Sequence, residues 1–90
     1  MIKEVEHNDG ESRLKGHVEV LKQMDGTFTV TQYVEDKKYG VPWEFVSPED
    51  VVNIADRQLK GVGKVLKKMA ENYRSKNTFT DLEDHGFSAP

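Results

Sequence analysis

The sequence contains no cysteine. This excludes disulfide staples, a thiol nucleophile and any thiolate-ligated metal site. Long apolar runs are also missing, since no stretch approaches the ~20 apolar residues that a membrane-spanning helix needs. The N-terminal residues MIKEVEHNDGES carry early acidic side chains and no apolar core of the kind found in signal peptides. We therefore expect a soluble, cytoplasmic protein that does not bind membranes.

Motifs for catalysis and for cofactor binding are equally scarce. The seven glycines never form GxGxxG or GxxxxGK[ST], the two patterns that cradle phosphates. The histidines form no HxH or HxxxH pair, whereas a metal site needs three or four converging ligands. These histidines are His7, His17 and His85. Glu44 lies between two aromatic residues, but strand alternation points it away from them and from the burial that acid–base catalysis would require. We expect no enzyme, no catalytic residue, no metal and no small-molecule cofactor.

Size and composition indicate a small folded domain with a thin margin of stability. With 36% hydrophobic and 32% charged residues, the 90-residue chain can form a core. A domain of this size buries only roughly 60% of the surface that its unfolded chain exposes. Small domains without staples often gain the missing burial by associating. We expect one domain over residues 1–90, with loosely ordered ends at 1–12 and 77–90.

The net charge of −3 hides an uneven distribution. Residues 1–56 hold 6 basic and 12 acidic side chains, residues 57–76 hold 7 and 1, and residues 77–90 hold none and 3. The three segments therefore carry −6, +6 and −3, which sum to −3. A basic segment of twenty residues inside an acidic protein is a hint about binding partners.

A β region is predicted over residues 16–46. The stretch HVEVLKQMDGTFTVTQYVED alternates apolar and polar residues with a period of two, which is typical of half-buried strands. A two-residue turn would set Val20 opposite Thr31 and mix the two faces. A three-residue loop, residues 24–26 with Gly26 left-handed, sets Val20 opposite Val30. We therefore predict the second register.

Two further segments can add strands to this hairpin. IKEVEH, with Ile2 and Val5, favours a strand, although its alternation is not clean. YGVPWEFV is rich in aromatic residues and predicts a short strand or an extended pass, in which Pro42 fits an edge or a bulge because it lacks an N–H donor. The aromatic residues of this segment are Tyr39, Trp43 and Phe45. Together with Tyr33, they form either part of the core or a binding patch.

A long helix is predicted over residues 48–75. Ser47 supplies an N-cap, and Pro48 suits the first helical position. Apolar residues then recur with alternating spacings of 3 and 4 at Val52, Ala55, Leu59, Val62, Leu66, Met69 and Tyr73. The phase of this seam is unbroken at Gly61 and Gly63. Two interior glycines cost about 2 kcal/mol relative to alanine, which burial of the seam can offset, so the pattern indicates one continuous helix.

The length of this helix predicts an overhang. It measures roughly 42 Å at 1.5 Å per residue, whereas an eight-residue strand covers about 26 Å. We expect residues 62–75 to extend beyond the sheet and to expose the seam to a partner. The C-terminal tail can cover the seam instead, through Phe79, Leu82 and Phe87, with a short helical turn beginning at Thr80. The predicted partner-binding residues are Val62, Leu66, Met69, Tyr73 and Trp43.

Together these patterns predict an α+β fold, in which a small antiparallel sheet of two to four strands packs on one long C-terminal amphipathic helix. The main functional hypothesis is a small non-enzymatic protein-interaction or regulatory module, of the kind that accessory or phage-like genes often encode. It would act through the helix, either as a homodimer or by docking on a partner protein.

The alternative hypothesis is a nucleic-acid-binding protein. Basic side chains on helix faces away from the seam would contact the phosphate backbone with salt-dependent affinity. No aromatic residue interleaves with them, so stacking on single strands is not supported. An ordinary solvated helix face explains the same pattern. The residues concerned are Arg57, Lys60, Lys64, Lys67, Lys68 and Arg74.

Overall fold

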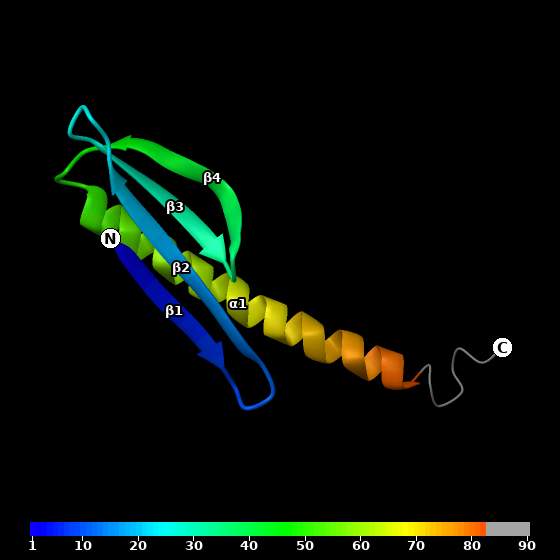
Figure 1. The fold of residues 1–90 in the computed structure, drawn as a ribbon. Coiled ribbons are helices and arrows are strands. Elements are labelled where there is room, and N and C mark those ends of the chain that lie inside the picture. The colour runs from blue at the N-terminus through cyan, green and yellow to red at the C-terminus, as the bar shows by residue number, and fades with distance from the viewer. Residues whose placement is uncertain (83–90) are drawn as a thin grey trace.

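The chain folds into a four-stranded sheet packed on one long helix (Figure 1). The computed structural model describes the backbone of residues 1–82 and the side chains of residues 1–73. Its elements are β1 (Ile2–Asn8), β2 (Arg13–Lys22), β3 (Phe28–Val34), β4 (Lys37–Val46) and α1 (Val51–Leu82). This is the predicted α+β architecture, with the strand count at the upper end of the predicted range.

The sheet is an antiparallel meander in the order β1-β2-β3-β4. In the β2–β3 hairpin Val20 lies opposite Val30, which confirms the predicted register. The Gln23 amide donates to the Thr27 carbonyl at 2.7 Å and closes a three-residue loop. Gly26 has a φ of +88°, the left-handed conformation that this loop requires.

The N-terminal segment forms strand β1 at one edge of the sheet. It lies within the predicted segment 1–12 and pairs with β2 from Ile2 opposite Glu19 to Asn8 opposite Arg13. Val5 packs against the core, and the Lys3 ammonium lies 2.5 Å from the Asp56 carboxylate on α1. These contacts tie β1 to the helix as well as to its neighbouring strand.

Strand β4 forms one edge of the sheet and departs from regular pairing. It follows β3 through a two-residue turn in which Glu35 has a φ of 58°. Its register shifts twice, once between the positions opposite Phe28 and Val30 and again between those opposite Val30 and Gln32. Pro42 falls within the second shift, so the prediction of an edge or bulge position for this residue is confirmed.

Helix α1 is continuous through both of its glycines, as the unbroken seam predicted. Helical hydrogen bonding begins at Ser47, whose carbonyl accepts from the Val51 amide at 3.0 Å. The Ser47 hydroxyl donates to the Asp50 carboxylate at 3.0 Å. At its other end the helix extends to Leu82, beyond the predicted end at residue 75, so the predicted turn at Thr80 begins inside α1. Residues 83–90, including Phe87, lie outside the described residues.

The core lies between one face of the sheet and α1. Its buried hydrophobic residues are Val18, Val20, Val30, Val46, Val51, Ala55, Val62 and Leu66. The prediction that Val62 and Leu66 are exposed on an overhang is therefore wrong, since both have no accessible surface. The ten residues of β2 span about 34 Å, which matches the roughly 30 Å of helix from residue 51 to residue 70. The overhang begins only after the buried Ala70.

One helix cannot cover a sheet of four strands. An α-helix with its side chains is about 10–12 Å wide, whereas β1 and β4 are separated by three strand spacings, or about 14 Å. Within the described part of the chain, α1 packs on β1, β2 and β3 and contacts β4 at most weakly. Strand β4 therefore projects beside the helix, as Figure 1 shows.

Candidate functional site

Among the residues whose side chains the structure describes, four exposed apolar side chains lie on β4. We call this group the β4 surface, and it comprises Tyr39, Val41, Trp43 and Phe45, with exposed fractions of 45%, 85%, 49% and 67%. Exposed apolar residues are ordinary when they are scattered, but a contiguous group marks a candidate binding surface. Tryptophan and tyrosine are also enriched among the residues that carry binding energy at interfaces.

The pairing of β4 with β3 determines the side of the sheet on which Tyr39 and Trp43 lie. Tyr39 and Trp43 lie opposite Gln32 and Val30, two residues on the helix-facing side of β3. Because α1 does not extend over β4, the rings of Tyr39 and Trp43 stay half exposed. Phe45 lies on the same edge strand with a φ of 59°. A positive φ is uncommon for any residue other than glycine and is especially unusual for a bulky one.

Two charged residues flank the apolar group. Lys38 precedes Tyr39 and Glu44 follows Trp43, and both side chains are exposed. Neither takes part in an ion pair within residues 1–73. Lys38 lies opposite Tyr33, whose ring stacks on His17, so it belongs to the outer face of the sheet, whereas Tyr39 and Trp43 lie opposite residues on the helix-facing side. Strand β4 thus carries one positive and one negative side chain beside its apolar residues.

A hollow of about 390 Å³ adjoins the start of β4 and is lined by the turn between β3 and β4, by Tyr39 and by Met69 of α1. Met69 is one of the predicted partner-binding residues, and the structure brings it close to the β4 surface. The other predicted residues are divided between two places. Trp43 lies on β4, and Tyr73 is 62% exposed on the first turn of helix beyond the sheet. Val62 and Leu66 are in the core.

The predicted basic residues lie on the solvent side of α1. We call Arg57, Lys60, Lys64, Lys67 and Lys68 the basic stripe, and all five side chains are exposed. At 3.6 residues per turn they share one side of the helix, opposite the buried residues Ala55, Val62 and Leu66. None of the five forms an ion pair with another described side chain. The side chain of Arg74 lies outside the described residues.

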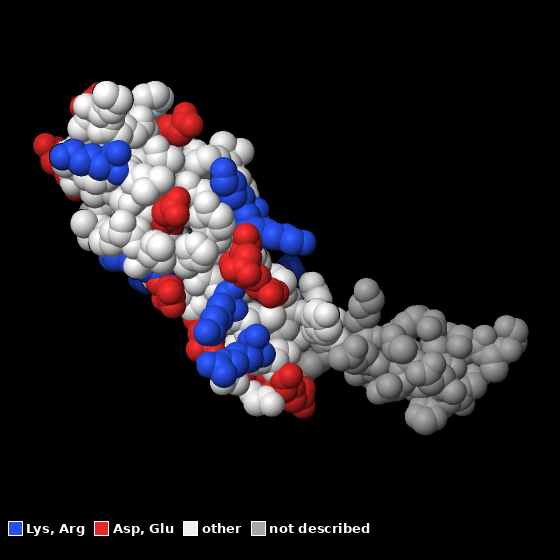
Figure 2. All heavy atoms as spheres, viewed as in Figure 1, with Lys and Arg blue, Asp and Glu red and all other residues white. Residues whose placement is uncertain are grey.

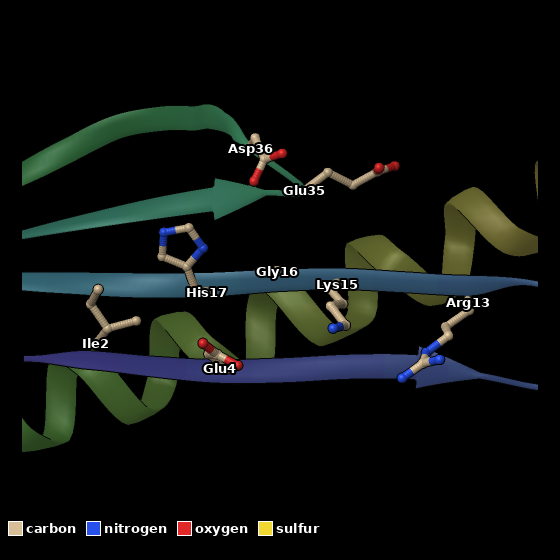
Figure 3. A pocket seen from close by; sticks show the side chains of 8 residues that line it. All are labelled: Ile2, Glu4, Arg13, Lys15, Gly16, His17, Glu35 and Asp36. Atoms are coloured by element: carbon tan, nitrogen blue, oxygen red, sulfur yellow. The ribbon is translucent and has the colours of Figure 1, made fainter.

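The outer face of the sheet carries mixed charges, with acidic and basic side chains interspersed in Figure 2. A shallow hollow of about 630 Å³ lies on this face (Figure 3), lined by Ile2, Glu4, Arg13, Lys15, Gly16, His17, Glu35 and Asp36. The His17 ring stacks on Tyr33 of the neighbouring strand, with ring centroids 4.4 Å apart and planes 7° from parallel. This stacking fixes the imidazole as a cross-strand contact.

The two histidines within the described residues take part in separate contacts. The His7 Nε2 lies 3.3 Å from the Asp9 carboxylate in the turn after β1, while His17 is stacked in the sheet. His85 lies outside the described residues. Among the described residues, no three side chains of the kinds that bind metals gather in one place.

Comparisons with protein-family models, with curated proteins and with solved structures found no match. Among the described residues, no helix combines the length and the apolar character needed to cross a membrane.

Sequence reasoning identified Trp43 but not the strand that exposes it. The aromatic residues of YGVPWEFV could equally have been core, and alternation does not show how many strands one helix covers. The available signals were Pro42, which is disfavoured in a central strand, and the lysines before it, since lysine and proline are both common on exposed edges.

Proposed function

We propose that this protein is a small non-enzymatic protein-interaction module whose partner docks on the β4 surface. The observation that supports the proposal is the exposure of Tyr39, Val41, Trp43 and Phe45 on one strand that α1 leaves uncovered. The proposal keeps the class of function that the sequence favoured and moves its centre from the helix seam to the edge strand.

The size of the patch supports this location. Aromatic side chains bury about 150–250 Å² each when they are fully covered. From their exposed fractions, the three aromatic rings leave roughly 320 Å² accessible, and Val41 adds to this area. Patches of roughly 300–600 Å² are the largest that typical monomers expose, and such patches are often functional.

The test compares two matched substitutions of an exposed apolar residue. Val41→Asp places a charge at the centre of the β4 surface, and Leu21→Asp places one on the outer face of β2, where Leu21 is 54% exposed. Both sites are open to solvent, so we expect the free energy of unfolding to change by about 0.5 kcal/mol or less. Cross-linking in the native host, followed by mass spectrometry, should identify proteins that are cross-linked to the wild type and to Leu21→Asp. The same proteins should be lost with Val41→Asp. An identical set of contacts for all three proteins would overturn the proposal.

A second candidate function is binding to the backbone of double-stranded nucleic acid. The observation that favours it is the basic stripe, whose five exposed cations have no ion-pair partner among the described side chains. Over residues 57–68 the stripe is about 17 Å long. Duplex DNA carries one charge per ~1.7 Å of axis, so a rod of this length faces several phosphates.

Charge reversal on the basic stripe tests this second function. Each phosphate contact contributes a slope of about −0.9 to the plot of log affinity against log salt, so binding by the wild type should weaken steeply as salt rises. The triple variant K60E/K64E/K67E replaces three of these contacts with repulsive charges and should abolish binding to duplex DNA at low salt. The control K15E/K22E/K37E makes the same charge change on exposed strand positions and should bind more strongly than the stripe variant. Equal affinities for the two variants would count against a role for the stripe.

A further inference from the structure

We propose that the occupant of the β4 surface is a second copy of this chain, related by a two-fold axis that passes beside Val41. The inference rests on the proposed function and makes it specific. Its basis is the order of side chains along β4, which is complementary to itself when the strand is reversed about Val41.

Antiparallel contact centred on Val41 pairs residues whose numbers sum to 82. Val41 then meets Val41 of the second copy, and Tyr39 meets Trp43 of the second copy. Lys38 meets Glu44 of the second copy, and the symmetry repeats this opposite-charge contact on the other side of the axis. Cross-strand aromatic pairs and opposite-charge pairs are both favourable neighbours. This register pairs Tyr39 with Trp43, Val41 with Val41 and Lys38 with Glu44, while Phe45 meets Lys37 of the second copy.

Neighbouring registers lose one of these features. A sum of 81 sets Lys38 against Trp43, and a sum of 83 sets Lys38 against Phe45. A sum of 84 keeps apolar pairs but leaves Glu44 opposite Gly40. A sum of 81 also pairs opposite charges, Lys37 with Glu44, but it sets Tyr39 against Pro42. Among these registers, the one centred on Val41 alone combines a lysine–glutamate contact with a Tyr39–Trp43 contact.

In this arrangement the two β4 strands lie edge to edge, with Tyr39 and Trp43 on the helix-facing side of the sheet and Lys38 on its outer face, but without a regular hydrogen-bond ladder. Pro42 has no N–H to donate, and the two register shifts of β4 interrupt its edge. Lysine, proline and bulges at a sheet edge disfavour indiscriminate pairing with other strands. Selectivity for a second copy then comes from the order of the side chains, which another strand would not share.

The small area predicts weak association. Two copies contribute roughly 640 Å² from their aromatic rings, less than the ~1,200 Å² of a standard stable interface. We therefore expect a reversible dimer with a dissociation constant on the order of micromolar or weaker, which is typical of small interfaces. Measurements should extend from about 5 to 500 μM protein.

The decisive experiment mixes two charge variants of the full chain in sedimentation equilibrium. K38E makes both flanks negative and E44K makes both flanks positive, so each variant repels itself across the axis. Each should dimerise about tenfold more weakly than wild type, because two favourable pairs become unfavourable. In an equimolar mixture every flank meets its opposite, and the mixture should associate at least as strongly as wild type. The double variant K38E/E44K should also recover wild-type association.

Matched controls separate this contact from general charge effects. K22E and E11K make the same two charge changes at exposed positions away from β4. Alone, each should dimerise like wild type, and mixing them should add nothing. Circular dichroism of every variant should show the wild-type fold.

Three outcomes would overturn the inference. They are a wild-type chain that stays monomeric at 500 μM, a Val41→Asp variant that dimerises normally, and a K38E and E44K mixture that is no stronger than the separate variants. A monomeric chain whose host contacts still depend on Val41 would reject the second copy as occupant and retain the proposed function. Loss of that dependence in the host would reject the proposed function itself.

Discussion

Gly16 of β2 lies directly against Val62 of α1. A Cβ atom built on Gly16 would overlap the Val62 Cγ1 and would lie 2.9 Å from the Tyr33 carbonyl oxygen. The missing side chain therefore lets the helix approach the middle of the sheet. The close approach of helix and sheet therefore depends on a glycine in a strand.

Gly16→Ala should destabilise the protein. The added methyl group has to displace Val62 and the backbone of β3, and overpacking of this kind typically costs about 1–3 kcal/mol. Urea denaturation followed by circular dichroism should show a lower midpoint with a similar slope. An unchanged midpoint would mean that the helix can move away from β2 without cost.

Gly61→Ala and Gly63→Ala should have the opposite effect. A Cβ on Gly61 would lie 3.7 Å from the Gln32 Nε2, and one on Gly63 would lie 3.5 Å from the Val5 Cγ2. Both distances are ordinary van der Waals contacts. Alanine should therefore gain up to about 1 kcal/mol at each site from helix propensity. Thermal unfolding measures the gain, and a lower melting temperature would indicate that close approach matters here too.

Leu66→Ala and Tyr73→Ala should separate the core from the overhang. Leu66 is fully buried, and truncating such a side chain costs about 2–5 kcal/mol. Tyr73 is 62% exposed, so its truncation should change the free energy of unfolding by about 0.5 kcal/mol or less. Chemical denaturation of both variants provides the comparison. Similar losses for the two would show that the helix beyond Ala70 is part of the cooperative core.

Thr27→Val should raise the pKa of Asp25. The Thr27 hydroxyl donates to the Asp25 Oδ1 at 2.5 Å and the Thr27 amide donates to the same atom at 2.9 Å. These bonds, the hydroxyl bond first, hold the pKa of Asp25 below its ordinary value. Valine removes the hydroxyl bond and keeps the amide bond. A carboxyl NMR titration should therefore find a higher pKa in the variant, and equal values would contradict this account.

The same bonds determine how acid affects the loop. Because the folded pKa of Asp25 is lowered, its contribution to stability is present above the unfolded pKa of about 3.9. This contribution is lost as the pH falls through the lower folded value. Because the Asp25 side chain is exposed, this pH dependence is best followed by the carboxyl NMR titration of Asp25 itself.

Local patterns were sufficient to predict much of the fold. The alternation of Val18, Val20 and Val30 fixed the hairpin register, because the other loop length mixed the two faces. Ser47 and Pro48 located the start of the helix, and the regular seam showed that it continues through its glycines. Each of these signals lies within a few residues of the feature that it predicts.

The remaining features depend on distances between elements. The burial of Val62 and Leu66 follows from the length of β2, which the sequence did not define, and from the contact at Gly16. The exposure of Trp43 follows from the width of four strands relative to one helix. The prediction of Trp43 and Met69 as partner-binding residues, like that of the basic stripe, remains for the proposed experiments to test.

Strand β1, at the opposite edge of the sheet, limits how far assembly can proceed. It is seven residues long and places Glu4 and Glu6 at exposed positions, while Lys3 is engaged with Asp56. Short, charged edges resist the addition of further strands. A dimer joined through β4 would therefore present only this opposite edge, and it would neither elongate into filaments nor recruit a third chain as concentration rises.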